Sequence, residues 1–351
     1  MPRRGVGWAA VLPPAVVPAL VPALLVAAGG VLTAWAGGAT ERAGLNAVIY
    51  VTIVVALSMF SGTTGVISVA HVGFVELGAY LTALLTMPVA FKRQVMPDMP
   101  AVLRTVALPF PLAALVAMAV TGVVAAVAGA FLMRLGGLQS AVATFSLLLL
   151  VDSVVGNWHS VTAGPSPLVG IPIHATTTIA VAVALVTILA ASVLRQSPLG
   201  LRLRAGRDDE VAATGSGIHV VADRRRAFVL SAAFAALGGA LLSSTLGTIS
   251  PDGFGLRMTV VVLTMLVVGG LQSLAGAVVG TVVVSVLTET LLRVENGTTL
   301  LGAHVKGPVG LSDVGLGLAF LVIVLWRPSG LTGGHEIALP FGKHTQQRKN
   351  P

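Results

Sequence analysis

The sequence contains no cysteine and few charged residues. Because cysteine is absent from all 351 residues, the chain has no disulfide framework, no thiolate metal site and no cysteine nucleophile. No G-x-x-x-x-G-K-[ST] phosphate-binding loop occurs, which excludes ATP hydrolysis by that route, and no cluster of His and Glu has metal-site spacing. We therefore expect the chain to bind no cofactor of its own and to take energy from a partner or an ion gradient.

Apolar residues dominate what is present. Hydrophobic residues make up 55% of the chain and charged residues 10%, whereas soluble domains carry about a quarter charged residues. A chain this apolar cannot hide its surface in one core, so the sequence predicts an all-α, polytopic integral membrane protein. The formal charge of +8 does not indicate nucleic-acid binding, because the basic residues punctuate hydrophobic runs.

The hydrophobic runs predict about ten transmembrane helices. The second and eighth runs are short, and the glycines beside them favour broken or re-entrant pieces there. The ten segments are 8–35, 45–59, 66–87, 106–131, 138–155, 178–194, 227–249, 259–268, 277–292 and 309–326.

The positions of lysine and arginine predict the orientation. With the N-terminus inside and ten alternating spans, 14 of the 21 basic residues fall on the inner side. Both termini and the loop 195–226 are then cytoplasmic. The N-terminal segment resembles a signal peptide in its basic start, but its apolar stretch is longer than a signal h-region, which favours an uncleaved first span. We expect a transmembrane domain over 1–331 and a polar cytoplasmic tail over 332–351.

The loop 195–226 gathers seven arginines, three aspartates and a glutamate. Its arginines alone are explained as a topology signal. Its acidic cluster, Asp208 to Glu210, would favour a helix N-terminus, and Gly215 and Gly217 would end that helix. The sequence thus predicts one or two short amphipathic helical turns with a surface for a protein partner.

This loop resembles that of a known family. "SPLGLRLRAGRDDEVAATGSGI" is similar to S-P-x-G-R-A-L-R-A-I-R-x-N-E-x-A-A-x-x-x-G-I, the cytoplasmic loop of permeases of branched-chain amino-acid ABC importers, the LivM group. Leu201 departs from the family's arginine, Gly206 replaces a bulkier residue, and Asp209 stands where asparagine is common.

Four further segments, in the family's order, extend the resemblance over most of the chain. "GTTGVISVAHVGFVELGAYLTALL" resembles the family's G-x-x-G-x-x-S-x-G-H-x-A-F-x-x-x-G-A-Y, with Ala70 in place of a glycine. The others are "RLGGLQSAVATFSLLLLVDSVVGNWHSVTAGPSPLVGIP", "ISPDGFGLRMTVVVLTMLVVGGLQSLAGAVVGTVVVSVLTE" and "RPSGLTG".

The resemblance implies a permease subunit in a bacterial or archaeal cytoplasmic membrane. Such a subunit pairs with a second permease of the LivH type and two cytoplasmic ATPases that use ATP, and it receives its cargo from an external binding protein. The loop would be the coupling helix that docks on an ATPase. We assign this coupling to Arg204, Arg207, Asp208, Asp209, Glu210, Ala212, Ala213 and Gly217.

Polar residues inside predicted spans are candidates for the translocation pathway. Ionisable groups in a bilayer are expensive and usually face a bundle interior or a wet pathway. His71, which matches the family, and Glu76, which does not, lie in the third span, and Thr144 and Asp152 lie in the fifth. The alternatives are a structural His and Glu, a helix-end role for Asp152, and a hydroxyl of Thr144 bonded to its own helix.

Three classes of function stay open. An ABC importer of branched-chain amino acids leads, with urea, short amides and small carboxylates as other cargoes. A self-contained transporter driven by protons through Glu76, His71 and Asp152 is the second class, and a membrane scaffold that transports nothing is the third.

Overall fold

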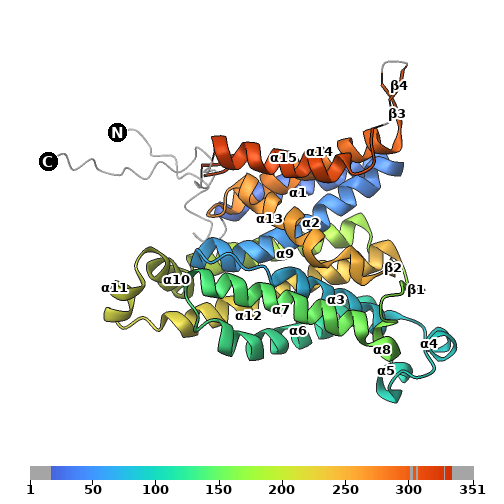
Figure 1. Cartoon of the computed structure of the whole chain (residues 1–351), viewed down its shortest axis with the longest axis horizontal. Coiled ribbons are helices and arrows are strands. Elements are labelled where there is room, and N and C mark those ends of the chain that lie inside the picture. The colour runs from blue at the N-terminus through green and yellow to red at the C-terminus, as the bar shows by residue number, and fades with distance from the viewer. Residues whose placement is uncertain (1–16, 301–302, 306, 328, 334–351) are drawn as a thin grey trace, which may run out of the picture.

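A computed structural model describes residues 17–300, 303–305, 307–327 and 329–333. The chain forms an elongated bundle of helices that run between two poles (Figure 1). The first nine residues of the predicted segment 8–35, and the predicted tail from residue 334 on, lie outside the described residues.

The bundle is built from apolar helices that match the predicted segments. Within the described part of the chain, eight helices are long and apolar enough to cross a membrane. They are α1 (Val17–Ala36), α2 (Gly38–Thr64), α6 (Phe110–Leu132), α7 (Gly137–Asn157), α9 (Thr177–Gln196), α12 (Val220–Leu246), α14 (Leu274–Asn296) and α13 (Gly255–Gly269) taken together with the 3-10 turn before it. A ninth span results if α3 (His71–Thr86) and α4 (Val89–Val95) count as one, and α15 (Leu311–Trp326) is apolar but shorter.

The expected breaks lie elsewhere than the sequence indicated. The second span is not short, because α2 has 27 residues, and the 3-10 turn η2 (Pro251–Gly253) precedes α13 and lengthens the eighth. The sharp bend, of 107°, lies between α3 and α4. Met87, which precedes Pro88, takes an extended conformation there because a residue before proline is disfavoured in the α region.

Helices α2, α3 and α12 form the centre of the bundle. In α2 and α12, 78% of the most apolar window is buried, against 22% in α1 and α6. The backbones of α3 and α12 touch: a Cβ at Gly78 would overlap Ala236, and a Cβ at Gly239 would overlap the carbonyl oxygen of Val75. Small residues allow this approach, as expected between membrane helices.

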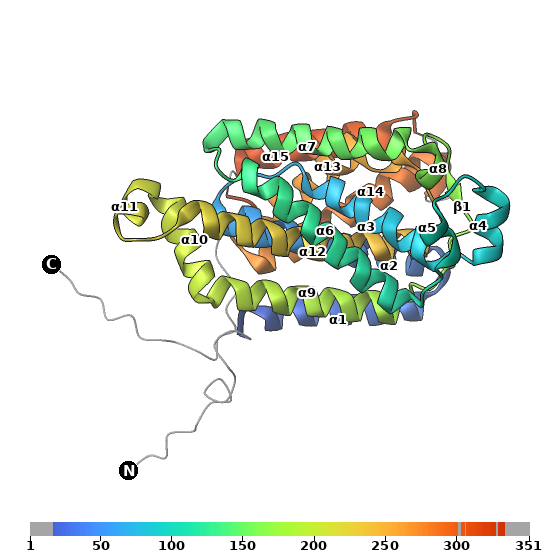
Figure 2. The same ribbon diagram turned by 90° about the horizontal axis from the view of Figure 1, so that it is seen from below.

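One pole holds α10 (Pro198–Asp208) and α11 (Glu210–Gly215), and we call it the inner pole (Figures 1 and 2). Both ends of the described chain lie here. The Leu331 amide donates to the Val268 carbonyl at 2.8 Å, and Arg195 Nη1 donates to the Gln272 carbonyl at 2.8 Å. Helix α1 also starts at this pole, which agrees with an even number of crossings.

The opposite, outer pole carries the short elements. They are α4, α5 (Ala101–Thr105), α8 (His159–Thr162) and two antiparallel pairs of strands. Strand β1 (Leu168–Val169) pairs with β2 (Thr248–Ile249), and β3 (Thr298–Leu300) pairs with β4 (Ala303–Val305). The protein is therefore all-α apart from these short strands.

Candidate functional site

The charged loop folds into a helical hairpin, α10 followed by α11. The Ser197 hydroxyl accepts from the Gly200 amide and starts α10. Asp209 separates the two helices, and its carboxylate accepts from the amides of Val211 and Ala212 at 2.9 Å, which caps α11. Gly217, with a φ of 83°, ends the hairpin. The predicted short helix that starts at the acidic cluster and ends at the glycines is thus confirmed as α11, whereas α10 is a longer helix of 11 residues.

Ion pairs hold this α10–α11 hairpin on α12. Arg224 makes a two-point contact with Glu210, with nitrogen to oxygen distances of 2.9 and 3.2 Å. The buried Asp223 accepts from Arg202 at 2.8 Å and from Arg226 at 2.9 Å. Glu210 and Asp209 therefore stabilise the hairpin itself, which the sequence pattern could not reveal.

Arg207 connects the hairpin to the end of α2. Its Nη1 donates to the Gly62 carbonyl at 3.4 Å, and its side chain packs where a Cβ at Gly65 would lie, 2.6 Å from Arg207 Cγ. Arg207 also pairs with Asp208 at 3.0 Å, whose side chain is 69% exposed. Of the three clustered acids, Asp208 is thus the one whose side chain, among the described residues, bonds only within α10.

The tip of the hairpin, α11, projects beyond the neighbouring helices (Figure 2). Val211 at this tip is 84% exposed, and Leu201 in the first turn of α10 is 56% exposed. Ala212 beside Val211 is exposed, Ala213 is buried beneath them, and Arg204 is half-buried on α10. Exposed apolar groups rimmed by charge mark a protein contact.

His71 is enclosed and fully hydrogen-bonded. Its Nδ1 lies 2.8 Å from Ser68 Oγ and its Nε2 lies 2.8 Å from Ser231 Oγ. The Ser231 hydroxyl donates its proton to the Phe228 carbonyl at 2.9 Å, so it accepts from His71 Nε2–H. Rings of Phe60, Phe74 and Phe228 surround the imidazole. This arrangement favours the structural interpretation of His71.

Thr144 lies near His71, at the irregular segment 65–70 between α2 and α3. Its hydroxyl donates to the Ala141 carbonyl at 2.9 Å and accepts from the Val69 amide at 3.3 Å. The own-helix alternative for Thr144 is therefore what the structure shows, and the same hydroxyl also ties α7 to this segment.

Glu76 and Asp152 form a second group, farther toward the outer pole. Glu76 is fully buried, and neither of its carboxyl oxygens has a hydrogen-bond partner among the described residues. Its carboxyl is an electrostatic neighbour of Asp152, and Tyr80 is a neighbour of both and of Asp252. Asp152 Oδ1 lies 3.5 Å from where a Cβ of Gly255 would stand. The four predicted pathway residues thus lie in two groups. Only the Glu76 and Asp152 group contains a buried carboxyl without a hydrogen-bond partner among the described residues.

Helix α7 presents an exposed line of polar side chains. Gln139, Ser146 and Ser153 are all exposed and repeat every seven residues, which is about two helical turns. The Ser146 hydroxyl donates to the Val142 carbonyl at 3.1 Å, so it is satisfied within its own helix. Val142, Leu149 and Leu150 are also exposed, so these polar groups lie on a largely apolar surface.

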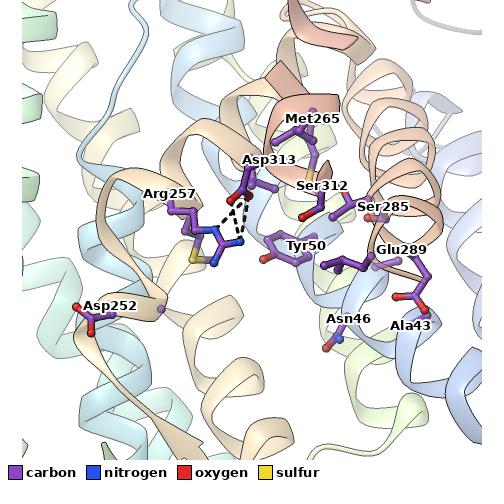
Figure 3. Close-up of a pocket in the computed structure, with 17 residues that line it drawn as sticks. Ala43, Asn46, Tyr50, Asp252, Arg257, Met265, Ser285, Glu289, Ser312 and Asp313 are labelled. Atoms are coloured by element: carbon purple, nitrogen blue, oxygen red, sulfur yellow. Dashed lines mark hydrogen bonds and ion pairs between the residues drawn. The ribbon is translucent and has the colours of Figure 1, made fainter. Parts of the chain in front are cut away.

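A pocket of about 300 Å³ opens near the outer pole, between α2, η2, α13, α14 and α15 (Figure 3). Arg257 binds Asp313 at 3.0 Å at its edge, and Tyr50 lies between Arg257 and Glu289. Many of its polar residues lie in the family-like segment 249–289, but none was identified as a site residue from the sequence. This outer pocket forms only where the segment packs against α2 and α15, which supply Tyr50 and Asp313.

Comparison with known proteins identifies the family to which this chain is similar. A family model described as "Branched-chain amino acid transport system / permease component" matches residues 39–324. The chain is 24% identical, over 81% of its length and 67% of the relative's, to the high-affinity branched-chain amino acid transport system permease proteins LivM of Salmonella typhimurium and Escherichia coli. It is 31% identical over 41% of its length, and 43% of the relative's, to BraD of Pseudomonas aeruginosa, which bears the same description. No solved structure gives a significant match.

The family match covers most of the chain and includes the central helices α2, α3 and α12 and the charged hairpin. Together with the apolar helices, it makes the protein a multi-pass protein of the inner membrane. The chain belongs to the permease components of branched-chain amino acid ABC transport systems.

Proposed function

We propose that this chain is the translocation subunit of an importer of branched-chain amino acids, working with a second permease of the LivH type. Two cytoplasmic ATPases would supply the energy through their ATP, and an external binding protein would deliver the cargo. The observation that carries this proposal is the α10–α11 hairpin, which combines an exposed apolar tip with ionic anchors to the central helix.

The hairpin is built to transmit force. Val211 and Ala212 at the tip, with Asp208 beside them, would contact an ATPase. Glu210 and Asp209 keep the hairpin rigid, Ala213 packs it from beneath, and Gly217 makes its closing turn. Arg207 connects the hairpin to α2, and Arg204 lies three residues before it, on the same side of α10. A push at the tip would therefore reach α2 through Arg207 and α12 through Glu210.

Alternating access needs a second body against which the bundle moves. We place the second permease, and the pathway between the two, along α7, because Asp152 of this helix is a neighbour of the buried Glu76 carboxyl. Glu76 and Asp152 would be wetted when the pathway opens. His71 and Thr144 would position the segment 65–70 rather than touch cargo.

The coupling is tested by placing a charge on the apolar tip. Val211→Asp should reduce co-purification of the ATPases and ATP-dependent uptake of leucine in proteoliposomes, because a carboxylate cannot enter an apolar contact without loss of solvation. Val309→Asp, at a residue that is 95% exposed near the outer pole, is the matched control and should leave ATPase binding intact. Equal ATPase binding by both variants would contradict this docking site.

One observation favours a different candidate. A buried carboxyl without a partner, Glu76, is what a proton-driven transporter would use. Uptake by the chain alone in vesicles that have a proton gradient and no ATP would support that candidate against the importer. The same uptake assay, run with urea and short amides, tests these alternative cargoes. Absence of uptake with every partner would support the third candidate, a membrane scaffold that transports nothing.

A further inference from the structure

The outer pocket has more negative than positive side chains. Asp252, Glu289 and Asp313 line it, and Arg257 is the only cation among the described lining residues. Asp313 is paired with Arg257, and Glu289 is paired with Arg293 at 2.8 Å. Asp252 forms no ion pair with any residue in the described part of the chain. The pocket therefore attracts a positive group.

Arg257 gives the same pocket a means to hold an anion. Its Nε and Nη2 atoms donate hydrogen bonds to the Asp313 carboxylate, at distances between 3.0 and 3.3 Å. The N–H donors of Nη1 are left for a ligand. Figure 3 shows the guanidinium directed toward Tyr50, into the space between α2 and α13.

Two hydroxyl groups on α14 lack partners. Ser285 Oγ and Thr288 Oγ1 are buried and line the pocket, and neither has a hydrogen-bond partner within the described residues. They are three residues apart and so share one face of the helix. Buried hydroxyls are normally satisfied, so their state fits a site that a polar ligand completes.

The remaining lining is apolar. Met258, Met265 and Leu316 are buried below the charged edge, and methionine adapts to ligands of different shape. At about 300 Å³, the volume lies at the small end of ligand sites. Asp252 is also an electrostatic neighbour of Asp152, so the pocket adjoins the Glu76 and Asp152 group.

We propose that the outer pocket binds a small zwitterion, with its ammonium group at Asp252, its anionic group at Arg257, and its apolar part on the methionines. The choice of a branched-chain amino acid as this zwitterion rests on the proposed function. The headgroup of phosphatidylethanolamine, which also joins an ammonium to an anion, is the other source of this chemistry.

Equilibrium binding of radiolabelled L-leucine to the full chain in phosphatidylcholine nanodiscs tests the site. Binding should be saturable, and Asp252→Asn or Arg257→Gln should each weaken it at least about tenfold, because each removes a charge-assisted hydrogen bond. 3-Methylbutylamine, which lacks the carboxylate, and 4-methylpentanoate, which lacks the ammonium, should compete poorly.

Matched control variants distinguish the loss of a charge inside the pocket from the loss of the same charge elsewhere on the protein. Asp98→Asn and Arg93→Gln alter exposed charges near α4 and α5, away from the pocket, and should bind leucine as the unaltered chain does. Circular dichroism and gel filtration of each variant confirm its fold. Loss of leucine binding in phosphatidylethanolamine nanodiscs, restored in phosphatidylcholine, would support the zwitterion site with the lipid as its occupant.

No saturable leucine binding in either lipid, or equal affinity in pocket variants and controls, would overturn the proposal. This failure is distinguishable from failure of the proposed function. If ATP-dependent uptake with partner subunits persists while the pocket binds nothing, the importer stands and the site falls. If no partner set supports uptake, the importer falls whatever the pocket binds.

Discussion

At the scale of single residues, polar groups inside this bundle differ in whether they have partners. His71 uses both ring nitrogens, and its hydrogen bonds join α3 to α12. Glu76 lies on the same helix as His71 but has no partner among the described residues. A buried polar group with hydrogen-bond partners stabilises the packing around it, whereas one without partners destabilises the folded protein. Such a group inside a membrane protein is therefore a candidate for a functional role.

Removing the hydroxyl that accepts from His71 should therefore destabilise the protein. In Ser231→Ala the Nε2–H is buried without an acceptor, which should lower the free energy of unfolding by about 1–3 kcal/mol. The matched control is Ser244→Ala on the same helix, because the buried Ser244 hydroxyl has no described partner, and its loss should cost little. Thermal unfolding in detergent compares the two, and equal melting temperatures would contradict the structural role of His71.

At the scale of elements, the hairpin and α12 act as a unit because their contacts are ionic and two-pointed. Arg224 is 10% exposed and Glu210 49% exposed, so this pair is shielded from water better than a surface pair. The caps at Ser197 and Asp209 fix each short helix locally, and the ion pairs fix the direction in which the hairpin points.

A charge exchange tests this unit. Glu210→Arg should reduce ATPase binding and uptake, because it places two arginines side by side, and Arg224→Glu should do the same with two acids. The double exchange restores opposite charges and should recover part of the activity without altering membrane insertion. If the double variant is no better than the single ones, Glu210 contacts the ATPase directly instead of Arg224.

At the scale of the whole molecule, the bundle separates a lipid-facing belt from a dense centre. Helices α1 and α6 expose most of their apolar windows, and α2 and α12 bury most of theirs. Lipid gives little driving force between apolar helices, so the centre depends on close backbone packing at residues such as Gly239. The hairpin and the described ends of the chain lie together at one pole (Figure 1).

The absence of cysteine makes this orientation directly testable. The unaltered chain should not react with a membrane-impermeant maleimide. Ser216→Cys, exposed in the hairpin, should react only from the cytoplasmic side, and Asp98→Cys, exposed near α5, only from the outside. Labelling of both from the same side would contradict the predicted topology.

The sequence by itself determined that this protein lies in a lipid bilayer, where its helical segments are, and which residues cap and end the helices of the charged hairpin. These depend on local composition and on neighbours a few residues away, since hydropathy and caps act over short stretches. The family also followed from the order of motifs along the chain. The lengths of the second and eighth spans were misjudged, because glycines beside α2 and a 3-10 turn before α13 blur the ends of apolar runs.

Only the tertiary structure decided which polar residues meet. His71 and Ser231 are 160 positions apart, and Arg257 and Asp313 are 56 apart. Their contact depends on how far each helix is turned and shifted against its neighbours, which hydrophobic periodicity leaves open in helices that are apolar on every side. For the same reason, only the structure showed that Glu210 pairs with Arg224, and that residues of α2 and α15 join those of segment 249–289 in the outer pocket.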